Sequence, residues 1–494
     1  LSLCMGALAL SASADVTTFM VEGSAACRYH GNGTIVTIPH GFTFTNKAGD
    51  TKCRTTNELD KTLVSNQVEI QSDRLRKSDR SFVTTEPITY TRCGQMFWYT
   101  GNNVRITPAA GTAITKIVVH TVNPGGNIPL NIVAVEDDKL VTKETFTKNE
   151  SDTTQIWTGK RTEAFNLWQG SGTLTPTWIE VTTEGTSTQV DIPVVKKTLP
   201  IVGKNEKIEL TCPTEGAQIY YTVTYTKDGK NESSKLMSTI ADATLYTGPF
   251  SLEGDAVVRA IAVKDGMTNS FPIYQEYYVV DDYNFMAEFN FNDHTSMKDM
   301  DGNQIAVYSK YPVGVSSTEK VSIAERTIFD KDVMCSSDEA SITLSNSFSG
   351  AIELRITKAK GKTCSVQAPA DYYISAMMMV VGWTADGLGI TSETPGTYAK
   401  SPHNAARKIY RNSDKDGFFA EFVTLNGDDE QRLDHLYVFL KSVDGSGVDG
   451  IEADLVDENA PVEYFNLQGV RVANPANGVF IKRQGHKATK VLVK

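Results

Sequence analysis

The stretch Asp255–Val263, with the sequence DAVVRAIAV, is the part of this 494-residue chain that most clearly sets its fold class. Side chains alternate between the two faces of an extended strand, so Val258, Ala260 and Ala262 share one face. A face that carries two alanines lets an opposing sheet approach closely. The stretch therefore predicts a strand inside a two-layer β-sandwich.

Short runs of β-branched and aromatic residues, bounded by Gly, Pro, Asn and Asp, recur along the rest of the chain. Such runs predict strands, whereas helical periodicity is scarce. The clearest runs are Gly33–Ile38, Ile114–Val119, Trp178–Thr183, Met286–Phe291, Ser341–Leu344, Ala351–Ile356, Tyr372–Val381, Gly417–Val423 and His435–Leu440. The spacing predicts an all-β protein of tandem antiparallel β-sandwich or jelly-roll domains, not parallel βαβ units.

The length accommodates roughly three to four domains of ~100–200 residues each. Polar, turn-rich stretches at 185–191 and 443–457 are typical of linkers. The predicted parts are a signal-peptide remnant (1–14), a β-sandwich (15–184), an immunoglobulin- or fibronectin-like β-sandwich (193–280), a further β-sandwich (283–446) and a small C-terminal β module (460–494).

The chain carries 48 Lys and Arg against 59 Asp and Glu, a formal net charge of −11. Proteins that bind nucleic acid gather basic side chains on the phosphates, so this excess of acidic residues argues against such partners. Glycans and other neutral or weakly charged components of a cell surface stay open as partners.

An apolar run, LSLCMGALAL, opens the chain, and Ala12 and Ala14 supply the small residues that a signal peptidase requires. We expect the chain to begin inside a signal peptide and the mature protein to be secreted or held at the outer cell surface. Cys4 follows Leu3 instead of a small residue, so a lipoprotein signal is the less favoured alternative. No later run reaches the ~18–20 apolar residues of a membrane-spanning helix.

Six cysteines remain after the signal segment: Cys27, Cys53, Cys93, Cys212, Cys335 and Cys364. An even number in an exported chain permits disulfides, but the sequence does not give their pairing and buried thiols fit as well. No Cys-x-x-Cys pair occurs, so neither a zinc ribbon nor a thioredoxin-type site is indicated.

Aromatic residues supply the candidate ligand-binding positions. Trp168 precedes Gln169–Gly172, which is typical of an exposed turn, and Trp98 lies in the aromatic triplet FWY. A flat indole can stack on the apolar C–H face of a sugar ring, so we take Trp98, Trp168 and Trp383 as candidate sugar-binding residues. The alternative is that these side chains fill a sandwich core.

The sequence holds no recognisable catalytic or cofactor motif. HExxH, GxSxG and GxxxxGK patterns are absent, and the seven histidines are scattered. The string Asn412–Gly417, NSDKDG, resembles the first half of an EF-hand loop, but Val423 stands where a bidentate Glu is required. We therefore expect an acidic turn there, and no metal site, cofactor or catalytic residues in the chain.

Three motifs in the middle part carry a resemblance to a known family. They are GAQIYYT at Gly216–Thr222, YTGPF at Tyr246–Phe250, and the Val258–Ala262 strand that leads to Gly266 and Ser270. Their order resembles the C-terminal domain of chitobiases and β-hexosaminidases, a β-sandwich, over residues 193–280. The resemblance implies an accessory domain that carries no catalytic residues of its own.

The C-terminal part carries a second resemblance. Its segments are VEYFNLQGVRV at Val462–Val472, PANGVFIK at Pro475–Lys482 and KVLVK at Lys490–Lys494. They resemble the type IX secretion sorting module of exported Bacteroidetes proteins, with Phe465 and Phe480 where that module has Tyr. Similar tails also occur without evident surface sorting, so a sorting role stays a hypothesis.

These observations favour a secreted or cell-surface protein without catalysis, which binds carbohydrate or acts as an adhesive accessory protein. Two alternatives stay open: a carbohydrate-active hydrolase with a jelly-roll catalytic domain, and a purely structural envelope protein. A cleft with two facing carboxylates would favour the hydrolase. A shallow face with an exposed Trp or Tyr would favour binding.

Overall fold

The computed structural model describes residues 14–493 of the chain with some gaps. The gaps are residues 23–31, 44–61, 80, 85–88, 93–94, 122–128, 150–152, 228–229, 232–242, 291–319, 323–327, 331–332, 338–339, 345–351, 357–359, 370–371, 382–386, 402–403, 405, 415–416, 418, 426–430, 444–461, 466–471, 474, 477 and 485–486. The described residues form strands and connecting segments only, which confirms the predicted all-β class. Nothing in this described part forms a helix long and apolar enough to cross a membrane.

The chain divides into two compact units, Leu1–Val443 and Asp444–Lys494. Within the first unit, the described strands group into three successive β regions, and each sheet draws its strands from only one of them. The exact domain limits given above stay predictions.

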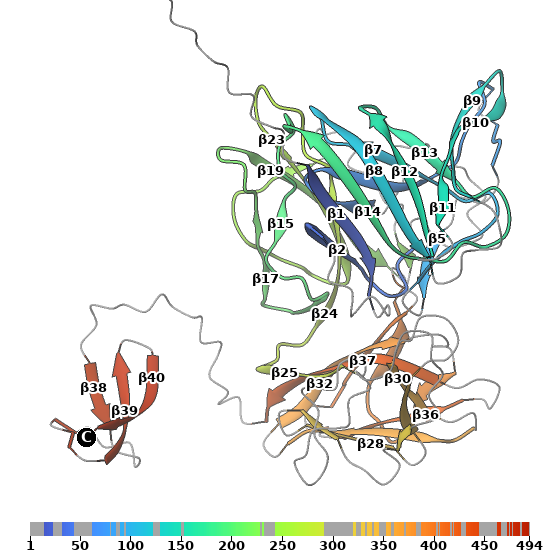
Figure 1. Cartoon of the computed structure of the whole chain (residues 1–494). Coiled ribbons are helices and arrows are strands. Elements are labelled where there is room, and N and C mark those ends of the chain that lie inside the picture. Colours follow the sequence, from blue (N-terminus) through green and yellow to red (C-terminus); the bar gives the residue numbers. More distant parts are fainter. Residues whose placement is uncertain are drawn as a thin grey trace, which may run out of the picture. The chain divides into compact units, whose positions relative to one another are not determined.

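The first region contains two facing sheets (Figure 1). Its strands are β1 (Asp15–Val21), β2 (Thr34–Ile38), β3 (Thr62–Val64), β4 (Val68–Asp73), β5 (Thr89–Arg92), β6 (Gln95–Trp98), β7 (Asn103–Pro108), β8 (Thr112–Thr121), β9 (Asn131–Glu136), β10 (Lys139–Thr145), β11 (Thr147–Asn149), β12 (Thr154–Arg161), β13 (Phe165–Trp168) and β14 (Pro176–Gly185). In the described part, the first sheet has the order β11-β12-β8-β14-β1-β2 and the second has the order β10-β9-β13-β7-β4-β3. Strands β5 and β6 form a separate antiparallel pair.

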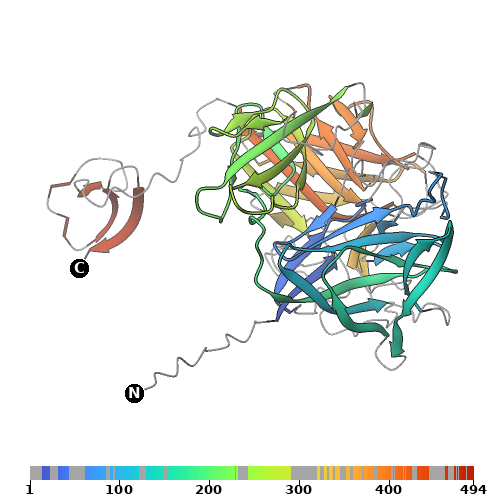
Figure 2. The ribbon, with the colours of Figure 1, turned by 90° about the horizontal axis from the view of Figure 1, so that it is seen from above.

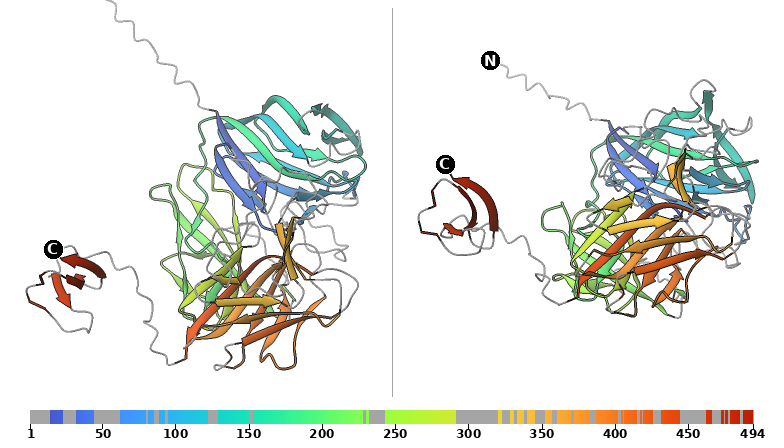
Figure 3. Two further views of the ribbon diagram at one scale, coloured as in Figure 1. Left: turned by 60° about the horizontal axis from the view of Figure 1, so that its bottom comes forward. Right: turned by 90° about the horizontal axis from the view of Figure 1, so that it is seen from below.

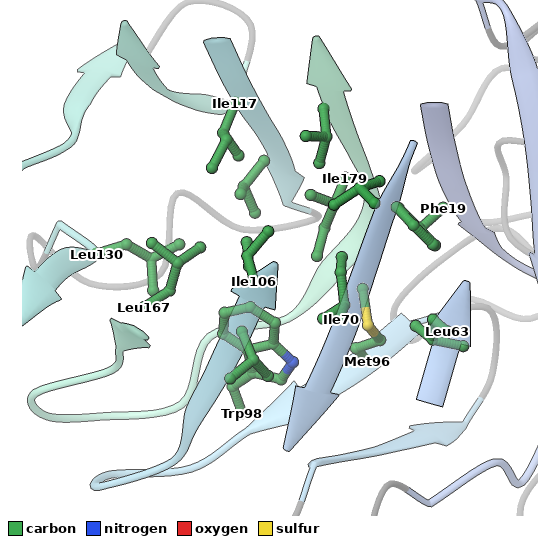
Figure 4. Packing of buried hydrophobic residues seen from close by; sticks show 14 of the residues in the cluster. Phe19, Leu63, Ile70, Met96, Trp98, Ile106, Ile117, Leu130, Leu167 and Ile179 are labelled. Carbon is green, nitrogen blue, oxygen red and sulfur yellow. The ribbon is translucent and has the colours of Figure 1, made fainter. Parts of the chain in front are cut away.

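The core of this sandwich lies between the two sheets (Figure 4). Phe19, Ile117 and Ile179 of the first sheet face Ile70 and Ile106 of the second, and none of the five is more than 1% exposed. The alternation that the sequence predicts in β2, β8 and β14 therefore places one face of each strand in a dry interior.

The middle region is the part with the family resemblance. Its strands are β15 (Val194–Val195), β16 (Ile201–Gly203), β17 (Lys207–Ile208), β18 (Leu210–Thr211), β19 (Gln218–Lys227), β20 (Lys230–Asn231), β21 (Thr244–Leu245), β22 (Phe250–Ser251), β23 (Ala256–Val263) and β24 (Ile273–Val280). The main sheet has the order β16-β24-β23-β19-β20, with β21 on β19, and two short pairs, β15–β18 and β17–β22, complete the region. Residues 207–210 thus contribute to two short strands, β17 and β18.

Packing in the middle region follows the alternation of β23. Val258, Ala260 and Ala262 are fully buried in one cluster, as predicted. Across it, the rings of Tyr221 and Phe250 stack with centroids 4.3 Å apart. The small side chains on β23 leave room for these larger rings. The alternation in Asp255–Val263 therefore determines how closely the two layers pack.

The third region also has two sheets. Its strands are β25 (Phe285–Asn290), β26 (Lys320–Ser322), β27 (Ile328–Asp330), β28 (Val333–Ser337), β29 (Ala340–Leu344), β30 (Ile352–Ile356), β31 (Thr363–Gln367), β32 (Tyr372–Val381), β33 (Leu388–Ile390), β34 (Thr397–Lys400), β35 (Arg407–Arg411), β36 (Phe419–Thr424) and β37 (Gln431–Ser442). The larger sheet has the order β26-β29-β30-β37-β32-β35-β34, with β25 on β37, and the smaller one has the order β27-β28-β31-β36-β33. Figure 2 shows this region in yellow to orange.

The middle and third regions share a buried interface. Tyr278 and Val280 of β24 pack against Met378 and Val380 of β32 and against Phe439 of β37. All five side chains are at most 5% exposed. These two sheets are therefore each buried on both faces.

Paired charges cross the same interface. Arg411 donates to both carboxylate oxygens of Asp255, at 2.7 and 2.8 Å, and its Nε donates to the carbonyl of Val279 at 3.1 Å. Arg407 forms an ion pair with Glu276, whose side chain is 7% exposed. An unpaired charge in this interface would destabilise the folded state, so these pairs hold the two regions in a fixed alignment.

The second unit is described by itself. Strands β38 (Val462–Phe465), β39 (Gly478–Gln484) and β40 (Lys487–Val493) form an antiparallel sheet in the order β38-β39-β40 (Figure 3). The predicted C-terminal strands are thus present, while the sorting role attached to them stays a prediction.

We predict that Ala260→Leu destabilises the protein by about 1–3 kcal/mol, because the added volume enters a filled core that has no space for it. Ile261→Leu, on the opposite face of the same strand, conserves volume and is expected to cost less. Urea unfolding followed by far-UV circular dichroism measures both. Equal stability of the Ala260→Leu variant and the wild type would contradict the close packing.

Candidate binding site

The outer face of the second sheet of the first region holds the candidate site. Along β13, Phe165 and Leu167 enter the core, so alternation places Asn166 and Trp168 on the outer face. In register across the sheet, Trp168 lies between Asn103 of β7 and Asn131 of β9. An indole flanked by two amide side chains is thus built by three neighbouring strands.

Trp168 is partly buried, and Gly170 lies against its ring. A Cβ atom on Gly170 would stand 2.9 Å from Cζ3 of the indole, so a glycine is needed for this close approach. The next glycine, Gly172, has a φ of 72°, in the left-handed region that glycine adopts without strain. The chain bends at the exposed Ser171 and Gly172, whereas Gln169, predicted to lie in an exposed turn, is only 2% exposed.

Two polar atoms at this corner lack a partner. Trp168 Nε1 and Gln169 Oε1 are buried and have no hydrogen-bond partner among the described residues. Buried donors and acceptors are nearly always satisfied in folded proteins. The corner therefore holds one donor and one acceptor that the described chain leaves unused.

A hydrogen-bonded cluster of polar side chains adjoins Trp168. The Asn166 amide donates to Asp73 Oδ2 at 2.9 Å and to Asn103 Oδ1 at 3.0 Å. Asn103 in turn donates to Thr84 Oγ1 at 3.3 Å. Asp73 is 5% exposed and Asn103 fully buried, so this cluster fixes the Asn side chains next to the indole.

Two carboxyl groups on β4 face the same side of the sheet. Burial raises the pKa of Glu69 to about 7, against the lowering effects of Gln71 and Arg105. Burial also raises the pKa of Asp73, which Asn166 partly offsets by its hydrogen bond. Such shifts occur at functional sites, but they also occur in structural clusters.

A hollow of about 660 Å³ begins at Asn166, two residues along β13 from Trp168. Val133 and Val135 of β9 and the charged side chains of Arg76 and Lys143 contribute to its lining. The hollow thus has both apolar and polar lining groups, and Trp168 itself is not among them.

The three predicted tryptophans have different positions. Trp98 is fully buried in the sandwich core beside Met96 (Figure 4). It has no surface to offer a sugar, so its proposed stacking role is wrong for this structure. Trp168 lies on the outer face, and Trp383 lies outside the described residues.

Other aromatic residues of the same stretch divide between core and surface. Trp157 and Phe165 are buried in the core, as the alternative interpretation of these aromatics held. Trp178 lies on the outer face of the opposite sheet, where its ring stacks on His120 with centroids 3.7 Å apart. His120 therefore covers one face of this indole.

Side chains that could hold a metal ion do not cluster in the described part of the chain. No group of three or more His, Cys, Asp or Glu side chains there could hold a metal ion. At the predicted acidic turn, Asp414 N–H donates to Asn412 Oδ1 at 2.8 Å and Gly417 N–H to Asp414 O at 3.1 Å. Cys212 is a free thiol, and Cys364 is buried.

Sequence reasoning missed Glu69, Asp73 and Asn166. Glu69 and Asp73 fall on the polar face of the alternating strand VEIQSD, a pattern that ordinarily signals solvent exposure. Their burial depends on segments distant in sequence, so no local signal could have identified them.

Comparison with known proteins gives one family match. Residues 201–274 match the model of the chitobiase/beta-hexosaminidase C-terminal domain, which confirms the resemblance of the middle region. The match covers a small part of the 494 residues, so it defines that region and not the whole chain. No curated protein matches the sequence.

Solved structures give loose likenesses. The chain is 9% identical to SGBP-B from a complex xyloglucan utilization locus in Bacteroides uniformis, with 70% of this chain and 96% of that one covered and a TM-score of 0.16. It is 11% identical to vicilin from Corylus avellana (hazelnut), with 81% and 86% covered and a TM-score of 0.13. At such TM-scores neither likeness carries an argument about fold or ligand.

We predict that the stability of the protein falls as Glu69 ionises. Its pKa in the folded protein, about 7, lies above the ordinary value of 4.5, so folding favours the protonated form and this stabilisation is lost as pH rises. Between pH 5 and pH 8 the loss is roughly 2 kcal/mol.

Urea unfolding at both pH values measures this loss. Glu69→Gln stays neutral and is expected to lack that component, whereas Glu215→Gln, at an exposed position, serves as the control. The same pH dependence in wild type and Glu69→Gln would show that Glu69 is not the group responsible.

Proposed function

We propose that this protein is a carbohydrate-binding accessory protein that carries no catalytic centre, and that Trp168 and the neighbouring Asn131 contact the glycan. The observation that carries the proposal is the indole of Trp168 on an outer sheet face, held between Asn103 and Asn131 and beside unused hydrogen-bonding atoms. The middle region, which matches the C-terminal domain of chitobiase and beta-hexosaminidase, supports a role connected with carbohydrate.

The chemistry of the face suits a neutral sugar. A partly buried indole offers an apolar surface for C–H groups, and the partly exposed amide of Asn131 beside it can bond to hydroxyl groups. Because Asn166 is fixed by Asp73 and Asn103, its geometry is set before a ligand arrives, which reduces the entropy lost on binding.

A glycoside hydrolase is the second candidate, and the β4 carboxyl groups are its best residues. Glu69 and Asp73 stand four residues apart on one strand, or ~13 Å at a rise of ~3.3 Å per residue. Glycosidase carboxyl pairs stand about 5–9.5 Å apart. Both side chains are also buried, at 6% and 5% exposure, so a glycosidic bond does not reach between them.

We also propose that the protein is exported, with Ala14 at the cleavage site and the C-terminal strands as a sorting module. In a Bacteroidetes host, mass spectrometry of the recovered protein is expected to show an N-terminus at Asp15. Removal of the residues after Asn459 would support type IX sorting. An intact N-terminal segment would contradict export through this signal.

We predict that Trp168→Ala weakens glycan binding about tenfold, the effect of losing ~1.4 kcal/mol of contact energy. A glycan array with the mature wild-type protein identifies a ligand, and calorimetric titration of both proteins with that ligand measures the change. Trp178→Ala is the matched control, since it removes a tryptophan from the opposite sheet, and it is expected to bind like the wild type.

Two results would contradict the proposal: a wild-type protein that binds no glycan, or a Trp168→Ala variant that binds as tightly as the wild type. Incubation with the identified glycan, followed by a reducing-sugar assay, tests the hydrolase separately. New reducing ends, released by wild type but not by Glu69→Gln, would favour the enzyme.

A further inference from the structure

A second cavity, of about 850 Å³, lies where the first and middle regions meet. The ends of β7, β8, β12 and β14 form one wall, and the turn Thr268–Phe271 of the middle region contributes the other. Its volume is within the range of ligand pockets, about 300–1,000 Å³. None of the groups at the Trp168 corner lines it.

Backbone contacts fix the floor of this cavity. Thr188 N–H donates to Ala110 O at 2.8 Å, and Thr268 N–H donates to Thr188 O at 3.1 Å. A Cβ atom on Gly111 would stand 2.5 Å from the carbonyl oxygen of Thr186. The segment that joins the two regions is therefore clamped to both of them and keeps the cavity in shape.

Gln189 is the residue that points to a ligand. Its side chain is 7% exposed and lines the cavity. Ala110 N–H donates to its Oε1 at 3.2 Å, and since a backbone N–H can only donate, this contact fixes the orientation of the amide. The Nε2 amino group is then left buried without a partner among the described residues.

The rest of the lining defines the class of ligand. Two basic residues, Arg105 and Lys160, and two acidic residues, Glu163 and Glu184, line the cavity, so the positive and negative charges balance. Phe271 adds an apolar surface. A neutral ring with several hydroxyl groups meets all these demands, because each hydroxyl both donates and accepts.

We propose that this cavity is a second glycan subsite, which takes a neutral sugar residue and offers Gln189 Nε2 to one of its oxygen atoms. The proposal rests on the carbohydrate-binding function above but uses none of the groups at the Trp168 corner. Because the basic and acidic lining residues balance, the cavity offers no net positive charge to compensate the burial of a uronic acid or a sulfated sugar, so a neutral sugar is favoured.

The test uses the full chain with Gln189→Glu and Asn269→Trp. The first keeps an oxygen for Ala110 N–H and removes the Nε2 donor, and the second fills the cavity from its exposed rim. Thr247→Trp, at an exposed position of the same region outside the cavity lining, is the control. Calorimetry with cellotriose, maltotriose and N-acetylchitotriose supplies neutral probes, and trigalacturonate supplies an anionic one.

We expect at least one neutral trisaccharide to bind the wild type and the Thr247→Trp variant alike. Gln189→Glu is expected to bind it at least tenfold more weakly, Asn269→Trp not at all, and trigalacturonate is expected not to bind the wild type. Unchanged binding by both cavity variants, or preference for trigalacturonate, overturns the subsite. If Trp168→Ala is the only one of these variants that abolishes binding, the carbohydrate-binding function stands and the cavity proposal falls. If the wild type binds no glycan, both proposals fall.

Discussion

The burial of two sheets on both faces is the constraint on which the first unit depends. The sheet of β23 and β24 uses one face for its own core and the other for the sheet of β32 and β37. Charged side chains at the margin of this second interface pair across it, and they range from 7% to 29% exposed. Arg407 pairs with Glu276, and Nη2 of Arg411 donates to both carboxylate oxygens of Asp255, so a sliding of one region over the other would separate these charges.

The sequence predicts this burial on both faces only in part. The alternation in Asp255–Val263 correctly predicts the core face with Ala260 and Ala262, but Arg259 on the other face is only 3% exposed. A signal did exist at Ala376–Val381, AMMMVV, where every residue is apolar. Met377 and Met379 enter the core of the third region while Met378 enters the shared interface, and a strand without a polar face is typical of burial on both sides.

At the candidate site, the local sequence does not predict which tryptophan is buried in the core. Trp98 and Trp168 both end short strands and both precede a polar turn with glycine, so their local sequences give no reason to separate them. The two tryptophans differ in their neighbours. The backbone N–H of Trp98 donates to the carbonyl oxygen of Leu174, and the Trp98 ring enters the core. Trp168 follows the core residue Leu167 on its strand, so its side chain lies on the opposite face. Strand partners are a property of the tertiary fold, and they were not available from single runs of residues.

The segment around Gln189, which joins the first and middle regions, affects how strongly the two proposed subsites can bind one glycan together. Its sequence, TSTQV, is typical of a flexible linker, yet its backbone is bonded to Ala110 on one side and Thr268 on the other. Strand β7 then connects the two subsites rigidly, since Asn103 lies at the Trp168 corner and Thr107 lines the cavity, ~13 Å away along the strand. At a fixed separation, a glycan held at one subsite meets the other at high effective concentration, so modest contacts at each would combine into useful affinity.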